Sequence, residues 1–349
     1  MKKYFEDTGW VFSRRQDICV FILLLGFFFA VQQIIFMAES ANLNDAKNFI
    51  IFNILFLAFF DIPHALSSFQ QVYKGEKKAE FSGLLFVPLI LFTCLFGLFY
   101  WVPKIAFSIV AYLSIFHVLR QQYGWMRFSQ TKSGHSLPPL QIRLDKILIY
   151  SLTCLPLVML HTGEELQKED FGWLMPGDLF FFPHQVIYKT AIFLFWSILA
   201  VYIGFQLWNY KKRQFFPLGK LIIFLSTGLA WYGGICFNVH GEQAIYIDGL
   251  HAAPYLWLVF QVRPSKIQGK SWPAWFRYYA PLAVGGLLWA FFFYRYGFAP
   301  SSLVSAFVLG VLVTISTSHY IFDAFIWKIK VPSKTVAQFL AVEGAHKSA

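Results

Sequence analysis

Four histidines lie inside long apolar stretches of the chain, where a polar side chain is costly to bury. They are His64, His117, His251 and His319. Each is followed, within 9 to 12 residues, by a basic residue at one end of its stretch. At about 1.5 Å per helical residue, all four lie roughly 14 to 18 Å from that end, near the middle of a bilayer core about 30 Å thick. Neutral imidazole is the commonest metal ligand, so four at one depth in a helical bundle predict a metal site.

Carboxylates and amides occur three or four residues from these histidines, on the same helical face. The pattern Asp-x-x-His is present twice, and each of the other two histidines has a polar residue four positions later. A carboxylate that accepts the second ring proton of a ligand histidine holds that ring in place, and one carboxylate could instead bind the metal directly. Arg120 lies near the same depth and could pair with the carboxylates. The candidate catalytic residues are therefore Asp61, Asp248, Asp323, Arg120 and Gln121.

The alternative for each histidine taken singly is a core residue hydrogen-bonded to a neighbouring helix. The shared depth and the repeated polar neighbours favour the metal site over four separate core residues. The remaining histidines lie in loops, in the tail or at helix ends, and we interpret them as surface or interfacial residues. They are His135, His161, His184, His240 and His346.

The composition of the chain indicates the elements that must position these side chains. Of 349 residues, 57% are hydrophobic and only 13% are charged. Soluble proteins carry charge on about a quarter of their residues, so this chain is predicted to be a membrane protein. Its four cysteines lie in apolar runs without a CxxC pair, which argues against a disulfide scaffold or a zinc ribbon.

About ten apolar stretches approach the roughly 20 residues that a helix needs to cross a bilayer. They are 18–37, 46–69, 81–101, 105–123, 147–161, 185–208, 221–237, 244–260, 279–293 and 303–326. No linker composition separates them. We expect one integral membrane domain over residues 1–349, an all-α polytopic bundle.

The basic residues predict the orientation of these spans, because cytoplasmic loops carry an excess of lysine and arginine. With the N-terminus inside, all but five of the 29 lysines and arginines fall on the cytoplasmic side, and the largest outer loop, 163–183, is acidic. We therefore expect both termini in the cytoplasm and a multi-pass protein of the cell (inner) membrane. The net charge of +11 is explained by this orientation and does not require a nucleic-acid partner.

Four neutral histidines with nearby carboxylates suit Fe(II), with zinc as the alternative metal. A metal near the membrane midplane is well placed for a lipophilic substrate that enters between helices, and for dioxygen, which dissolves in lipid. We therefore expect an iron oxygenase or dioxygenase that acts on a lipophilic, unsaturated small molecule. This expectation follows from the depth of the site, since no substrate motif is present.

Two other functions remain open from the residues. Intramembrane Asp and His can form the relay of an ion- or proton-coupled transporter, and the two Asp-x-x-His segments could belong to a repeat. Stoichiometric metal would distinguish the enzyme from the relay. A lipid-modifying transferase that uses His and Asp without metal would need a nucleophile or donor motif, and the sequence holds none.

The segment Ile62-Pro63-His64-Ala65-Leu66, together with the further membrane histidines, resembles the Brp/Blh-type β-carotene 15,15'-dioxygenases of bacteria and archaea. The resemblance implies a multi-span helical fold with iron on four histidines and a carotenoid substrate cleaved to retinal. It assigns His64 to the family's Pro-His motif and the other three histidines to ligands by role. The segment from His319 to Lys328 is similar to one in uncharacterised bacterial membrane proteins.

Overall fold

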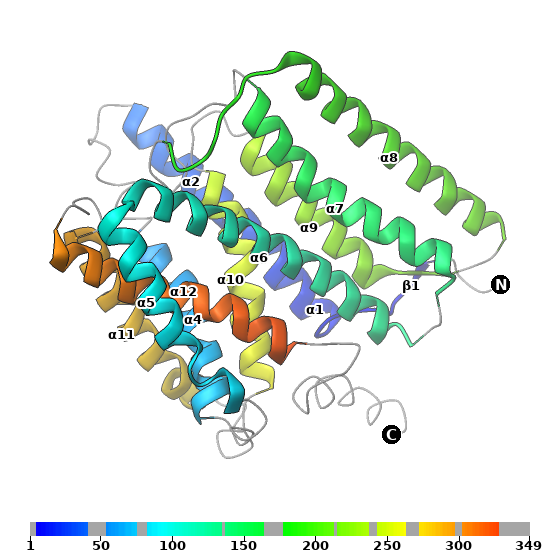
Figure 1. Cartoon of the computed structure of the whole chain (residues 1–349). Helices are drawn as coiled ribbons and strands as arrows, with labels where there is room; N and C mark the ends of the chain where they lie inside the picture. Colours follow the sequence, from blue (N-terminus) through cyan, green and yellow to red (C-terminus); the bar gives the residue numbers. More distant parts are fainter. Residues whose placement is uncertain are drawn as a thin grey trace. The chain divides into compact units, whose positions relative to one another are not determined.

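The computed structural model describes residues 5–40, 54–74, 82–134, 137–163, 177–212, 215–236, 243–262, 272–296 and 302–327 (Figure 1). These residues are almost entirely helical. The two short strands among them, β1 (Phe5–Glu6) and β2 (Phe216–Pro217), pair in parallel. The first half of the chain forms α1 (Arg14–Asp17), η1 (Ile18–Leu23), α2 (Leu24–Ser40), η2 (Leu57–Asp61), α4 (Ile62–Phe69), η3 (Gln70–Lys74), α5 (Val87–Trp101), α6 (Pro103–Lys132) and α7 (Pro139–Thr162), where η marks π-helix. The second half forms α8 (Gln185–Lys211), α9 (Leu218–Ile235), α10 (Gln243–Gln261), α11 (Trp272–Tyr296) and α12 (Leu303–Ile326).

Eight helices within the described residues are long and apolar enough to cross a membrane. They are Arg14–Ile34, Ser82–Trp101, Pro103–Lys132, Pro139–Thr162, Gln185–Lys211, Leu218–Ile235, Phe276–Tyr296 and Leu303–Ile326. The predicted all-α, multi-pass membrane character is thus confirmed.

The other two predicted spans are also helical where the structure describes them. The stretch 46–69 begins outside the described residues, and its described part forms η2, α4 and η3. The stretch 244–260 forms α10, in which Asp248 and His251 lower the mean hydropathy. Most of the acidic loop predicted at 163–183 lies outside the described residues.

Two helices are longer than their apolar stretches. The helix α6 continues to Lys132, past the predicted end at Tyr123, and α7 begins at Pro139 rather than Ile147. In both cases the polar extension is still buried: Gln130 of α6 and Asp145 of α7 join one hydrogen-bonded cluster. A prediction from hydropathy alone makes such a helix too short, because it assigns a buried, paired polar residue to a loop.

The contacts divide the chain into two compact units. Unit 1 comprises Met1–Met37 and Phe116–His251, and unit 2 comprises Ala38–Ile115 and Ala252–Ala349. The helices α2, α6 and α10 each continue from one unit into the other. The single membrane domain expected from the sequence stays a prediction.

In unit 1, α7 packs against both α8 and α9 (Figure 1). The N-terminal segment lies against the start of α9: the Gly219 N–H donates to the Thr8 carbonyl at 3.1 Å, and a Cβ on Gly219 would lie 2.0 Å from the Gly9 carbonyl oxygen. Glycine is therefore required at position 219 by this close approach. The Ser129 hydroxyl of α6 donates to the same Gly9 carbonyl at 2.6 Å.

Unit 1 also contains a buried ion pair. The Lys220 ammonium lies 2.9 and 3.1 Å from the two carboxylate oxygens of Asp145, and the two residues are 1% and 0% exposed. Gln130, Gln141 and Tyr202 donate three further hydrogen bonds to the same carboxylate, at 2.6 to 2.8 Å. A buried charge pair is tolerable only when its remaining hydrogen-bonding sites are filled, and these contacts fill them.

In unit 2, α12 packs against α5 and α4, and α11 packs against α4, η2 and α12 (Figure 1). The contact of α11 with η2 depends on Gly286, where a Cβ would lie 2.0 Å from the Ala58 carbonyl oxygen. The Trp289 indole N–H donates to the Leu312 carbonyl at 2.9 Å, which joins α11 to α12. These close contacts set α4 beside α12, the two helices that carry His64 and His319.

Candidate metal centre

The helix α4 presents His64 from its first turn. Pro63 occupies that turn, and the π-helix η2 runs directly into it, so the missing N–H of Pro63 removes one donor where the π-helix passes into the α-helix. Single π-turns in α-helices are frequent at functional sites, because the extra residue re-aims the side chains that follow. The buried face of α4 comprises Ile62, Pro63, His64, Ala65, Ser67 and Ser68.

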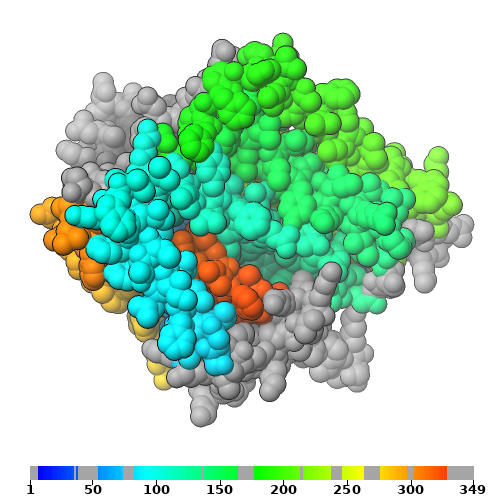
Figure 2. All heavy atoms as spheres, viewed as in Figure 1, coloured from blue at the N-terminus to red at the C-terminus, as the bar shows by residue number. Residues whose placement is uncertain are grey.

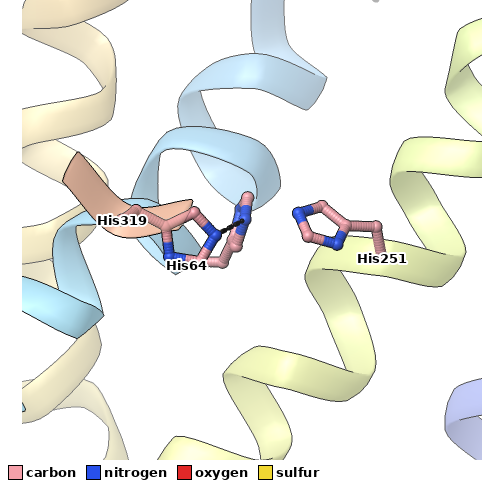
Figure 3. Close-up of side chains that lie close together, drawn as sticks. All are labelled: His64, His251 and His319. Atoms are coloured by element: carbon pink, nitrogen blue, oxygen red, sulfur yellow. Dashed lines mark hydrogen bonds between the residues drawn. The ribbon is translucent and has the colours of Figure 1, made fainter. Parts of the chain in front are cut away.

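His64 of α4 and His319 of α12 form a buried pair in unit 2. Their Nε2 atoms lie 3.0 Å apart in hydrogen-bond contact, and their rings are nearly perpendicular at 88°. Figure 3 shows the two side chains turned toward each other; His251, drawn in the same figure, belongs to unit 1. The histidines are 2% and 0% exposed. His64, His319 and Asp323 are among the buried side chains that could hold a metal ion.

A carboxylate faces the other ring nitrogen of each histidine. Asp61 Oδ1 lies 3.4 Å from His64 Nδ1, and Asp323 Oδ1 lies 3.4 Å from His319 Nδ1. The contacts expected from the spacings of three and four residues are thus present. The two Nε2 atoms can share a proton in a hydrogen bond when one ring carries its proton on Nε2. When both rings carry their proton on Nδ1, toward the acids, the two Nε2 lone pairs face each other and can bind one metal ion.

The separation of the two nitrogens fits a shared metal ion. Two ligand nitrogens about 2.1 Å from an ion and at right angles would lie about 3.0 Å apart, and a tetrahedral angle would place them about 3.4 Å apart. The observed 3.0 Å is within this range. Hydrogen-bonded carboxylates behind the ring are the usual support for such ligands, since they fix the tautomer and raise the basicity of the bound nitrogen.

Three further residues of unit 2 complete the surroundings of His319. The Ser68 hydroxyl lies 2.9 Å from His319 Nδ1 and donates to Asp323 at 2.9 Å. The Tyr255 hydroxyl donates to the same carboxylate at 2.6 Å and accepts from the Trp327 indole at 3.1 Å. Ser68, Tyr255 and Trp327 were not predicted from the sequence. Each lies four residues after a predicted site residue, so the helical spacing that identified the acids would also have identified these three.

His117 and His251 form a second pair, in unit 1. Their ring centroids are 5.0 Å apart at an interplanar angle of 88°, and both residues are buried. The Oε1 atom of Gln121 lies 2.8 Å from His251 Nδ1. An amide oxygen can only accept, so this contact places the proton of His251 on Nδ1 and leaves a lone pair on Nε2 for a ligand. The sequence predicted Gln121 as the partner of His117, on its own helix, whereas the structure pairs it with His251.

The remaining two predicted residues lie in unit 1. Asp248 is half-buried on α10, one turn before His251. Arg120 is exposed on α6, and its guanidinium donates to the Tyr150 hydroxyl of α7 at 2.6 Å. Its described hydrogen bond is therefore made to a phenol and not to one of the candidate acids.

Comparisons with known protein families, with curated proteins and with solved structures find no match to this chain.

Proposed function

We propose that this protein is a membrane-embedded, metal-dependent oxygenase that oxidises a lipophilic, unsaturated small molecule with dioxygen. His64, His117, His251 and His319 are the proposed ligands, and Fe(II) is the proposed metal, with zinc as the alternative. The proposal includes ten spans, both termini in the cytoplasm and a location in the cell (inner) membrane. Asp61, Asp248, Asp323 and Gln121 are proposed to orient the ligand rings.

The observation that carries the proposal is the arrangement of His64 and His319 in unit 2. The Nε2 atoms of the two rings lie 3.0 Å apart and an acid lies 3.4 Å from each Nδ1 atom, an arrangement that suits a bound metal ion. A Lys or Arg beside the acids would have neutralised them permanently, but imidazole can exchange its proton for a metal ion. The assignment of His117 and His251 to the same ion rests on the common depth of the four histidines in the sequence.

The class of reaction follows from the chemistry of the ligands and from their depth. An iron ion on neutral nitrogen ligands supplies one-electron chemistry with dioxygen. The residues of this chain would hold the rings in their ligand tautomers, through Asp61, Asp323 and Ser68, and would exclude bulk water by burial. The carotenoid cleavage implied by the family resemblance is one member of the proposed substrate class.

Elemental analysis of the detergent-purified protein tests the proposal. We expect about one iron ion per chain, and its loss in His64→Ala and in His319→Ala. His161→Ala is the matched control, because His161 is a half-buried histidine at the end of α7 whose Nδ1 contacts the Leu157 carbonyl at 2.7 Å. The control variant should keep the metal of the wild type.

Three results would count against the proposal. Wild-type protein without stoichiometric metal would favour the proton-coupled transporter. Zinc in place of iron would keep the site but remove the oxygenase chemistry. Equal metal in wild type, His64→Ala and His319→Ala would show that these histidines do not bind it.

A further inference from the structure

The exposed guanidinium of Arg120 is held in place on the surface of unit 1. Its Nη1 atom donates to the Tyr150 hydroxyl at 2.6 Å, and its Cζ atom lies 5.3 Å from the centre of the Tyr123 ring. The two tyrosine rings stack at 5.5 Å with an interplanar angle of 15°. A long side chain that is fixed by two aromatic residues has already lost much of its rotamer entropy, so less is lost when it binds a ligand.

The position of Arg120 along its helix makes an anion the expected partner. It precedes Arg127 by seven residues, which places it about 10 Å further into the membrane than that residue. A guanidinium has five N–H donors, and among the described residues Arg120 uses one of them, on Tyr150, and pairs with no carboxylate. An exposed, unneutralised arginine at this depth is costly unless an anionic group or water reaches it.

The neighbouring face of α7 is also basic. Arg143, Lys146, Ile147 and Tyr150 follow the helical spacing of three, four and seven residues, and Arg143, Lys146 and Ile147 are exposed. On α6, Phe116 lies one turn before Arg120 and is 61% exposed. The α6–α7 face is the surface formed by these exposed side chains. It is basic at the C-terminal end of α6 and the N-terminal end of α7, where Arg127 and Arg143 lie. It is apolar on the N-terminal side of Arg120 along α6. Figure 2 shows parts of α6 and α7, in teal and green, at the surface of the molecule.

We propose that this α6–α7 face binds one anionic phospholipid. The lipid phosphate accepts hydrogen bonds from the Arg120 guanidinium, with Lys146 adding positive charge one turn from Tyr150. An acyl chain lies along the exposed side chain of Phe116, on the apolar side of Arg120. Arginine suits this role because its planar fork matches two phosphate oxygens at once. The apolar flank and the membrane depth favour a lipid phosphate over a free phosphate ion.

Native mass spectrometry of the detergent-purified protein tests this site. Phosphatidylglycerol and phosphatidylcholine are titrated separately, and the first bound lipid is counted. We expect tighter binding of phosphatidylglycerol, and a loss of about fivefold in its affinity in Arg120→Gln, since one basic residue near a membrane surface contributes about that factor. Arg295→Gln is the matched control, because Arg295 is also exposed and lies 5.4 Å from the ring of Tyr296 but has no tyrosine hydroxyl bond among the described contacts. Its affinity for phosphatidylglycerol should stay within about twofold of wild type.

A second variant covers the case in which Arg120→Gln does not fold. Tyr150→Phe keeps the charge and removes the hydroxyl that holds the guanidinium, and a smaller loss of affinity for phosphatidylglycerol is expected. Equal affinity of the two lipids for wild type, or unchanged affinity in both Arg120→Gln and Tyr150→Phe, would overturn the proposal. Displacement of the bound lipid by millimolar inorganic phosphate would show that the face is a phosphate site and not a lipid site.

Discussion

Among the described residues, each unit has a buried carboxylate that accepts several side-chain hydrogen bonds, Asp145 in unit 1 and Asp323 in unit 2, and the two networks differ in the cation that they offer. In unit 1, Asp145 is paired with the Lys220 ammonium and receives three further hydrogen bonds. In unit 2, Asp323 receives hydrogen bonds from Ser68 and Tyr255 and faces an imidazole, His319, in place of an ammonium. An ammonium has three donors and no lone pair, whereas a neutral imidazole has a lone pair that can bind a metal.

The difference indicates which network is structural. The Asp145–Lys220 pair neutralises itself and has no capacity for a ligand, so its role is to join α7 to α9. The acids of unit 2, Asp61 and Asp323, instead lie 3.4 Å from the Nδ1 atoms of two imidazoles, each of which can offer a nitrogen lone pair to a metal ion. The predictions below test this distinction between a stabilising network and a binding network.

The largest effect on stability is expected from Lys220→Met. The substitution leaves the Asp145 carboxylate buried without its cation, which typically costs about 3–5 kcal/mol in the free energy of unfolding. Denaturant unfolding in detergent would measure it. The double variant Lys220→Met/Asp145→Asn should recover most of the loss, because no charge is then buried. A single variant within about 1 kcal/mol of wild type would show that the pair is not the stabilising element.

In unit 2, Asp323→Asn is expected to have the largest effect on metal affinity among substitutions that keep all the proposed ligands. The amide keeps one acceptor oxygen but loses the negative charge, so it accepts more weakly from the Ser68 hydroxyl, the Tyr255 hydroxyl and His319, and the His319 ring loses part of its support. We expect the metal affinity to fall about tenfold to a hundredfold while metal still binds. Competition with a chelator of known affinity would measure the change. An unchanged affinity would place Asp323 outside the metal centre.

Asp61→Asn tests the corresponding contact at His64, and Asp248→Asn tests the residue before His251. Both substitutions should lower the metal affinity about tenfold to a hundredfold without abolishing metal binding. Unchanged affinity in both variants would mean that the repeated Asp-x-x-His spacing is a coincidence. The same chelator competition gives the result for both.

The smallest and most closely matched comparison uses two tyrosines. The Tyr255 hydroxyl donates to Asp323 at 2.6 Å, and the Tyr202 hydroxyl donates to Asp145 at 2.8 Å. Phenylalanine at either position should lower the free energy of unfolding by about 0.5–1.5 kcal/mol. Only Tyr255→Phe should also weaken metal binding. If Tyr202→Phe changed the metal affinity equally, the two networks could not be assigned separate roles.

The helices could be predicted well from the sequence, because long apolar stretches have few alternatives in a membrane. The differences from the sequence prediction lie at buried polar residues. Lys220, just before the predicted span 221–237, is buried in α9 and paired with Asp145. Pairing across helices is not visible in a hydropathy profile. For this reason the predicted spans at α6 and α7 leave out the buried polar ends of both helices.

At the candidate site, the sequence identified partners on the same helix and missed partners on other helices. The spacings placed Asp61 beside His64 and Asp323 beside His319, because three or four residues complete one helical turn. The bond of Gln121 to His251, and that of Tyr255 to Asp323, depend on how separate helices pack. Residue spacing contains no information on that packing.

X-ray absorption spectroscopy at the iron edge tests the central claim most directly, since it reports which atoms surround the metal. The account predicts nitrogen neighbours at about 2.1 Å with the outer-shell scattering of imidazole rings, and fewer such rings in His319→Ala than in wild type. The spectrum of His161→Ala should match that of wild type. An iron environment without imidazole, or one that is identical in wild type and His319→Ala, would contradict the account.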